Sequence, residues 1–506
     1  MKVSFVKAPI GGIIGLEMIT FVEPLGFECV AGGLEQEGHT CQIVDLRIDG
    51  LEKGIAKVRA FEPDIVGLQC NFTTERFRML RLARRIKQEF PDVLVVAGGH
   101  DASRDPRWFL KPGVDVIVIG DGEEVMPLLV AAWSRTKDLR NVPGLLIHST
   151  FQSSGGPIQT PPAPARPNID ELPFPARHLI KEYAGEYYIN FRRPLALLET
   201  ARGCPFKCNF CSVWKFHEST FREKSPARVV KELAEIEAPN VFITDDIFWM
   251  NVKRGRELGK ALIESGIRKH YTIQTRSDII CKFPDLIEMW KGCGRMTVFL
   301  GLEKVDDEGL RSVNKKNTAD NNNKAIRILQ ELGVGYTPNF IVDPMWDRED
   351  FDKLKRWIDE TGAYNSGFSV LTPLPGTDLW DEVEPDVQTR DWELFDIAHT
   401  VLPTKLPLHE FYAQYAGLWK HGTEVRYQKE GKFRTYLLLA AALATRKVTF
   451  SAIRKGMRLG MGKVLSTPDS FLRAHHESDA RLAAAQELYA DLVSGDRSAT
   501  RNAALL

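Results

Sequence analysis

Three cysteines stand close together near the middle of the chain, with the spacing Cys-x3-Cys-x2-Cys. They are Cys204, Cys208 and Cys211, in a chain with eight cysteines among its 506 residues. Thiolates are soft ligands that suit iron–sulfur clusters and zinc. A zinc site would need a fourth Cys or His close by, and the only candidate, His217, lies at a spacing that fits no common zinc pattern. The spacing therefore favours a four-iron cluster in which one iron stays open to a substrate or cofactor.

The cysteine loop resembles that of the radical S-adenosylmethionine (SAM) enzymes, whose motif reads Cys-x3-Cys-x-aromatic-Cys. Phe210 occupies the aromatic position. The resemblance implies that the three cysteines hold a [4Fe–4S] cluster, and that SAM binds the open iron and is cleaved to a 5′-deoxyadenosyl radical. The alternative is three structural thiols in a turn, which is disfavoured because Gly203 and Pro205 hold the loop open.

Length and composition set broad limits on the protein. A chain of 506 residues predicts about two to four domains. The 67 basic and 67 acidic residues balance, which argues against nucleic acid as a partner. Eight cysteines without regular spacing favour a reducing compartment. The start carries no apolar run of signal-peptide length and no stretch could span a bilayer, so we expect a cytoplasmic protein.

Short apolar strands alternate with helical patterns over residues 1–150. The expected strands are Lys2–Lys7, Cys41–Leu46, Asp64–Gln69, Val93–Ala97 and Val114–Ile119, with helices from near Pro24 to Glu37, over Thr74–Glu89 and over Glu123–Trp133. Apolar strands separated by helices imply parallel pairing with both faces covered. We therefore predict an α/β fold that opens with a doubly wound, Rossmann-like sheet, whose ligand lies beyond the carboxyl ends of the strands.

Glycines gather in the loops at those strand ends. Gly98-Gly99-His100 follows the fourth expected strand and Gly120-Asp121-Gly122-Glu123 follows the fifth. Glycine allows close approach of a ligand to the backbone, although a tight turn is the alternative for each pair. No Gly-x-Gly-x-x-Gly fingerprint follows the first strand, which argues against a dinucleotide.

These loops resemble those of the cobalamin-binding domain at the amino end of many radical SAM enzymes. The resemblance implies that cobalamin contacts Gly98, Gly99, His100, Gly120, Gly122 and Glu123. The Asp-x-His-x-x-Gly motif that supplies a histidine to cobalt in other cobalamin proteins is missing. We therefore assign no lower ligand to the cobalt.

A stretch rich in Ser, Gly and Pro over residues 151–194 is expected to be a linker along the surface. Six strand–helix units follow over residues 195–400, with strands at Leu195–Glu199, Asn240–Thr244, Tyr271–Thr275, Thr297–Glu303, Tyr336–Val342 and Gly367–Leu371. This series predicts a partial (β/α)6 barrel of the TIM type, whose chemistry lies at the carboxyl ends of the strands. The cysteine loop follows the first of these strands.

Charged residues end the next strands of the expected barrel. The resemblance implies that Asp245 contacts the amino group of SAM, that Arg276 pairs with its carboxylate and that Glu303 lies near its ribose. For each residue a helix cap or a surface ion pair is the alternative.

Residues 401–506 are expected to be helical. Between Gly431 and Pro468 there are eight basic residues and no acidic one. A basic amphipathic helix here fits a membrane surface or a partner, and an ordinary helix packed on the barrel fits equally well.

Over residues 1–400 the chain resembles the cobalamin-dependent radical SAM enzymes, which implies methyl transfer to an unactivated sp3 carbon. Such a carbon has no acidic proton, so hydrogen abstraction must first make a radical. Ala8–Gly12 and Asn71–Arg76 resemble the hopanoid C-3 methylases. That resemblance implies a hopanoid lipid substrate, which the basic carboxyl-terminal helix fits through peripheral contact with the inner membrane. The radical SAM resemblance implies an electron donor such as a flavodoxin or ferredoxin.

Two alternatives stay open. The anaerobic Mg-protoporphyrin monomethyl ester cyclases share the domain order of this chain and have a sequence similar to its residues Cys211–Phe216. The other alternative is a non-enzymatic cobalamin-binding sensor whose cluster is structural.

Overall fold

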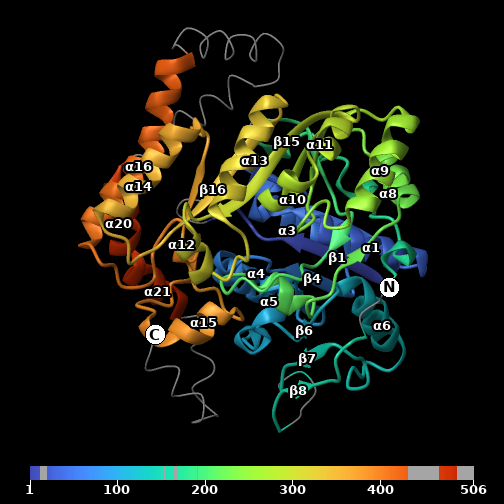
Figure 1. Ribbon diagram of the computed structural model, residues 1–506. Coiled ribbons are helices and arrows are strands. Elements are labelled where there is room, and N and C mark those ends of the chain that lie inside the picture. Colours follow the sequence, from blue (N-terminus) through green and yellow to red (C-terminus); the bar gives the residue numbers. More distant parts are fainter. Residues whose placement is uncertain are drawn as a thin grey trace.

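Two large sheets, the first mostly parallel and the second fully parallel, and a group of carboxyl-terminal helices form the main body of the computed structural model of the chain (Figure 1). The structure describes residues 1–11, 20–149, 151, 155–164, 168–190, 192–430 and 467–486. In the view of Figure 1 the first sheet lies below the second, and the carboxyl-terminal helices lie at the left. The α/β architecture expected from the sequence is confirmed.

The first sheet has seven strands in the order β3-β1-β4-β5-β6-β7-β8. The strands are β1 (Lys2–Lys7), β3 (Thr40–Asp45), β4 (Ile65–Gln69), β5 (Leu94–Gly98), β6 (Val116–Val118), β7 (Leu145–Ile147) and β8 (Ile158–Gln159). The five predicted strands are β1 and β3 to β6, and they pair in parallel. The antiparallel strands β7 and β8 were not predicted, because they are short and flanked by Pro and Gly.

Helices cover both faces of the first sheet, as predicted. The helices α1 (Leu25–Gln36) and α6 (Gly122–Arg135) pack on one face, and α3 (Leu51–Phe61) and α4 (Arg76–Glu89) pack on the other. The helix α3 was missed in the sequence. It has few buried apolar residues and contains Gly54, where an added Cβ would lie 1.9 Å from the Leu46 side chain.

Part of the expected surface linker belongs to the core of the first sheet. Strand β8 extends the sheet past residue 150. Further along, Ile180, Tyr183 and Tyr187 are buried in the same apolar cluster as β1. The hydroxyl of Tyr187 donates to Asp45 at 3.1 Å, at the end of β3. The segment therefore holds the sheet together instead of spacing two domains apart.

The second sheet has six parallel strands in the order in which they occur along the chain. They are β10 (Leu195–Leu198), β13 (Asn240–Ile243), β14 (Lys269–Thr275), β15 (Gly294–Glu303), β16 (Gly335–Val342) and β17 (Gly367–Val370), covered by α8 (Pro226–Glu235), α9 (Val252–Ser265), α11 (Pro284–Lys291), α13 (Ala319–Glu331) and α14 (Arg348–Thr361). All six predicted strands are present. Along β15, Val298, Leu300 and Leu302 are buried against helices, whereas Phe299 on the opposite face is 38% exposed. The sheet is thus a partial barrel with an accessible inner face.

The described carboxyl-terminal helices are α16 (Leu408–Glu430), α20 (Pro468–His476) and α21 (Ser478–Gln486). The helix α16 packs against the barrel, whereas α20 contributes Phe471 to the barrel core and Ala474 to the core of the first sheet, and α21 contributes Ala485 to the latter. The rings of Tyr412 and Phe471 stack with centroids 5.0 Å apart and join α16 to α20. The basic helix expected between Gly431 and Pro468 lies outside the described residues. None of the helices in the described ranges has the length and apolar character that crossing a bilayer requires.

The segment after β17 returns to the first sheet and packs around Arg76. The guanidinium of Arg76 is fully buried, and it pairs with Asp101 at 2.6 Å and with Asp105 at 2.9 Å. It also lies 4.7 Å from the ring centroid of Trp108 and 4.5 Å from that of Trp392. Because Trp392 follows the barrel in the chain, this one side chain links both halves of the protein.

The substitution Arg76→Met tests this link. It leaves the Asp101 carboxylate buried without its main partner, so we expect the free energy of unfolding to fall by about 3–5 kcal/mol. Arg59→Met is the matched control, because Arg59 pairs with Glu89 at an exposed site and such pairs contribute about 1 kcal/mol or less. Urea unfolding followed by circular dichroism measures both, and equal losses in the two variants would contradict the assignment.

Candidate active site

The cysteine loop begins at the carboxyl end of β10, as the barrel rule requires. Two short antiparallel strands, β11 (Ala201–Arg202) and β12 (Arg222–Glu223), frame it. Gly203 has a φ of +91°, and an added Cβ would lie 2.2 Å from the Thr220 carbonyl oxygen. Only glycine fits at this position, so the entry to the loop is fixed by backbone geometry.

The three thiols influence one another inside the loop. Burial raises the pKa of all three, and it raises that of Cys211 to about 12, with smaller contributions from Cys208 and Cys204. In the described ranges no three Cys, His, Asp or Glu side chains converge on a single metal position. The three thiolates fit a four-iron cluster with one open iron, because the next cysteine in the chain is the distant Cys281. His217, the only other zinc candidate, is hydrogen-bonded to Arg222 at 3.2 Å.

A segment that was not predicted from the sequence, residues 312–314, forms hydrogen bonds with the cysteine loop. The backbone N–H of Asn209 donates to the Val313 carbonyl at 3.4 Å, and its side-chain amide donates to the Ser312 carbonyl at 3.1 Å. The Asn314 side chain donates to the Lys207 carbonyl. Residues 312–314, which follow the fourth barrel strand, thus hold the loop backbone on both sides of Cys208.

Glu303 and Arg276 both lie beside this segment. Glu303 has a φ of +65° at a bulge in β15, and it pairs with Lys315 at 2.7 Å. The guanidinium of Arg276 lies 3.8 Å from the ring centroid of Phe206, pairs with Asp278 at 2.9 Å and donates to the Lys315 carbonyl at 3.2 Å. Both residues therefore stand at the cysteine loop with protein partners, and their contacts with SAM stay predictions.

Two neighbouring acids at the end of β13 differ in what they face. Asp245 is 1% exposed and accepts hydrogen bonds from the backbone and the hydroxyl of Thr200. Asp246 accepts from the backbone N–H of Gly203 at 3.2 Å, at the start of the cysteine loop. Burial raises the pKa of Asp245 to about 7 and that of Asp246 to about 6. The predicted residue Asp245 thus fixes the strand end, and Asp246 lies closer to the thiols.

A buried ion-pair group joins the cysteine loop to the first sheet. Arg202 pairs with Glu123 at 2.6 Å, with Glu199 at 2.8 Å and with Asp121 at 3.5 Å. Arg222 pairs with Asp121 at 3.0 Å. Burial raises the pKa of Asp121, but the two guanidinium groups outweigh it and hold that pKa below its ordinary value. The loop predicted to contact cobalamin therefore docks on the frame of the cysteine loop.

Two further contacts bring the same edges together. The Nε2 atom of His100 lies 2.8 Å from the Ser212 hydroxyl, and its ring centroid lies 4.7 Å from that of Phe216. Arg104 donates to the carbonyl of Pro375, in the loop after the sixth barrel strand. The carboxyl ends of the two sheets therefore face each other, with the predicted cobalamin loops on one side and the three cysteines on the other.

The predicted glycines fall into two groups. An added Cβ at Gly99, where φ is +106°, would lie 2.7 Å from the Cys70 carbonyl, and one at Gly122 would lie 3.1 Å from Val30. These two fit tight packing. Gly98 would meet Val118 at 3.7 Å, an ordinary contact. Gly120 has a φ of +94° and no atom within 4 Å of its added Cβ, so it offers room for a ligand to approach the backbone.

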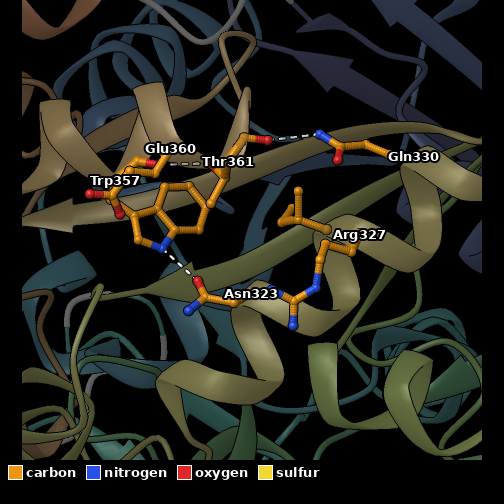
Figure 2. A pocket seen from close by; sticks show the side chains of 7 residues that line it. Asn323, Arg327, Gln330, Trp357, Glu360 and Thr361 are labelled. Atoms are coloured by element: carbon orange, nitrogen blue, oxygen red, sulfur yellow. Dashed lines mark hydrogen bonds between the residues drawn. The ribbon is translucent and has the colours of Figure 1, made fainter.

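A hollow of about 220 Å³ lies elsewhere, between α13 and α14 (Figure 2). Trp357 donates to Asn323 at 2.7 Å and Gln330 donates to the Thr361 carbonyl at 2.9 Å along its wall. These residues belong to the helices that cover the barrel, and none of the predicted site residues lines the hollow. It is therefore separate from the candidate active site.

The raised pKa of Asp245 predicts a pH-dependent stability. Because the folded protein binds this proton more tightly than the unfolded chain does, wild-type stability falls as the pH rises from about 4 to about 7. Asp245→Asn removes the titrating carboxyl group. As the pH rises over this range, the free energy of unfolding of the variant therefore increases relative to that of wild type, by at most about 4 kcal/mol. Urea unfolding of both proteins at pH 5 and pH 8 measures the change. An unchanged difference between the two proteins would show that Asp245 is ionised throughout.

Comparisons with known proteins match both halves of the chain. Residues 12–130 match the B12 binding domain, and residues 198–358 match the radical SAM superfamily. The hopanoid C-3 methylase of Methylococcus capsulatus is 35% identical over 396 residues, which are 78% of this chain and 75% of that protein. The anaerobic magnesium-protoporphyrin IX monomethyl ester cyclase of Rubrivivax gelatinosus is 27% identical over 402 residues, 77% of this chain and 71% of that protein.

Solved structures share the fold. The cobalamin-dependent radical enzyme OxsB, with aqua-cobalamin bound, aligns with 98% of this chain and 82% of its own at 16% identity and a TM-score of 0.66. The methyltransferase TsrM from Kitasatospora setae, with cobalamin and a [4Fe–4S] cluster bound, aligns with 77% of this chain and 76% of its own at 20% identity and a TM-score of 0.58.

The family, enzyme class and cofactors expected from the sequence are confirmed, and the non-enzymatic sensor is set aside. The two apposed edges and the matches to both halves lead to one conclusion. The chain belongs to the cobalamin-dependent radical SAM methyltransferases, which use a [4Fe–4S] cluster, SAM and cobalamin.

Proposed function

We propose that the protein adds a methyl group to C-3 of a hopanoid lipid. The observation that carries the proposal is the 35% identity to a hopanoid C-3 methylase, which extends over 78% of this chain. The target carbon is sp3 and has no acidic proton, so no side chain of ordinary pKa can activate it as a base. The apposed carboxyl edges are the place where such a carbon would meet both cofactors.

The cysteine loop supplies the metal ligands in this proposal. Cys204, Cys208 and Cys211 hold the cluster, with Phe210 beside the last thiol. When bound, the cofactors supply a 5′-deoxyadenosyl radical and a transferable methyl group. The protein's own part is to fix the loop, through Gly203 and residues 312–314, and to keep water away from it.

The charged strand ends form the SAM side of the site. We assign Arg276 to the SAM carboxylate and Glu303 to its ribose, and the acids that end β13 to its amino group. Asp246 lies nearer the loop than Asp245 does, because it accepts from the Gly203 N–H. The left-handed backbone of Glu303 supports a functional role, since strain of about 1–3 kcal/mol is typical of such sites.

The glycine loops form the cobalamin side. Gly120 supports this assignment best, because it offers open space at the edge of the first sheet. Gly98, Gly99 and Gly122 shape the turns around it, and Glu123 fixes the loop through Arg202. His100 belongs to the same edge, next to the cysteine loop.

We divide the chain accordingly into a cobalamin domain (residues 1–150), a connecting segment (151–194), a SAM barrel (195–400) and a helical region (401–506). The connecting segment packs with the first domain. A flavodoxin or ferredoxin supplies the electron for SAM cleavage. A lipid substrate also requires access to a bilayer, so we assign the basic stretch between Gly431 and Pro468 to peripheral contact with the inner membrane.

Reconstitution with labelled SAM tests the substrate. The full chain is loaded anaerobically with iron, sulfide and cobalamin, reduced, and incubated with a hopanoid and SAM that carries a deuterated methyl group. We expect a 3-methylhopanoid with the label, together with 5′-deoxyadenosine, both measured by mass spectrometry. Cys208→Ala should abolish both products, whereas Cys281→Ala, a cysteine outside the loop, should leave them unchanged.

Two outcomes would contradict the substrate assignment. Cleavage of SAM without any change in the hopanoid would discard it. Oxidation of Mg-protoporphyrin monomethyl ester by the same preparation would instead favour the cyclase reaction, since a cyclase of that type is 27% identical over 77% of this chain.

A further inference from the structure

His100 makes a contact that its predicted place at the cobalamin does not explain. It follows Gly99, which has a left-handed φ of +106° and where an added Cβ would lie 2.7 Å from the Cys70 carbonyl oxygen. The backbone N–H of His100 donates to the Asn71 side chain at 3.1 Å. The residue is thus held at its backbone by the ends of β4 and β5, and its starting point on the first sheet is fixed.

The imidazole of His100 then crosses to the barrel. Its Nε2 atom lies 2.8 Å from the Ser212 hydroxyl, and Ser212 directly follows Cys211. Its ring packs against Phe216 in α7 (Val213–Phe216), with centroids 4.7 Å apart. Ser212 is only 8% exposed, so the hydrogen bond is shielded from water. One unbroken set of contacts thus runs from Asn71 through His100 to the residue beside a cluster ligand.

This contact differs in kind from the ion-pair group around Arg202. The ion pairs join two long, flexible side chains to carboxylates, and they resist separation of the edges. The His100 imidazole resists sliding instead, because a shift of one edge along the other would break both its hydrogen bond to the Ser212 hydroxyl and its packing against the Phe216 ring. Misplacement of reacting groups by 1 Å can reduce a rate by about 100-fold. The carboxyl edges of the two sheets, which carry the cofactor loops, must therefore be held at a fixed position relative to each other, and a contact of this kind can do so.

We propose that His100 is a positioning residue that sets the distance between the cobalamin edge and the cluster loop, acting through Ser212. It acts on the geometry between the cofactors, and not as a ligand of either one. The proposal rests on the cofactor pair of the family and is independent of the hopanoid substrate.

Pulsed electron paramagnetic resonance tests the proposal without any substrate. The full chain, loaded with the cluster and cobalamin and poised with a [4Fe–4S]+ cluster and cob(II)alamin, carries two paramagnetic centres whose dipolar coupling reports their separation. We compare wild type with His100→Ala, Ser212→Ala and the double variant, and with His100→Gln, which keeps a hydrogen-bonding nitrogen near the Nε2 position. His178→Ala is the matched control, because that histidine is on the surface with its side chain 64% exposed.

We expect wild type, His100→Gln and His178→Ala to give one narrow distance distribution. Both alanine variants at the contact should broaden or shift it while the iron and cobalamin contents stay at wild-type values. The double variant should match the single ones, because both remove the same contact. Should His100→Ala fail to fold, Ser212→Ala still tests the proposal.

Two results would overturn it. An unchanged distance distribution in Ser212→Ala and His100→Ala would show that the contact does not set the geometry. Loss of bound cobalamin in His100→Ala alone, with Ser212→Ala normal, would make His100 a cobalamin contact.

Discussion

The protein depends on a buried ion-pair group between its two sheets. Arg202 stands at the entrance of the cysteine loop, and its partners Asp121 and Glu123 stand in a loop of the first sheet. Buried charges are costly to leave without partners, by several kcal/mol for each one. Separation of the sheets would take Asp121 and Glu123 away from Arg202, which would keep only Glu199, so these ion pairs hold the carboxyl edges together. A reaction that passes a radical and a methyl group between two cofactors needs that proximity.

Other contacts build on this arrangement. Residues 312–314 hold the cysteine loop, while Arg76 ties the segment after the barrel to the first sheet. The helix α20 packs against α16 through the stacked rings of Phe471 and Tyr412. The barrel, the first sheet and the carboxyl-terminal helices thus form one body, with the three cysteines at the meeting point of the two sheets. The inner face of the barrel stays accessible below them, as the exposure of Phe299 indicates.

Much of this could be predicted from the sequence, because local patterns determine it. The alternation of apolar strands with helices predicts both sheets, and the spacing of the three cysteines predicts the cluster-binding loop. What escaped prediction depends on segments that are distant in the chain. Nothing near Arg202 in the sequence reveals Glu123 as its partner. The hydrogen bonds from Asn209 to the carbonyls of Ser312 and Val313 have no local sequence pattern either. The roles of Asp245 and Asp246 could not be separated either, since adjacent residues differ only in the direction that the folded backbone gives them.

A crystal structure of the full chain loaded with the cluster, SAM and cobalamin would show directly whether the two carboxyl edges enclose both cofactors. We expect cobalamin to lie between the loop from Gly120 to Glu123 and the cysteine loop, with Arg202 still paired to Glu123. Cobalamin bound away from these two edges, or edges that move apart with the Arg202 pairs broken, would contradict this expectation.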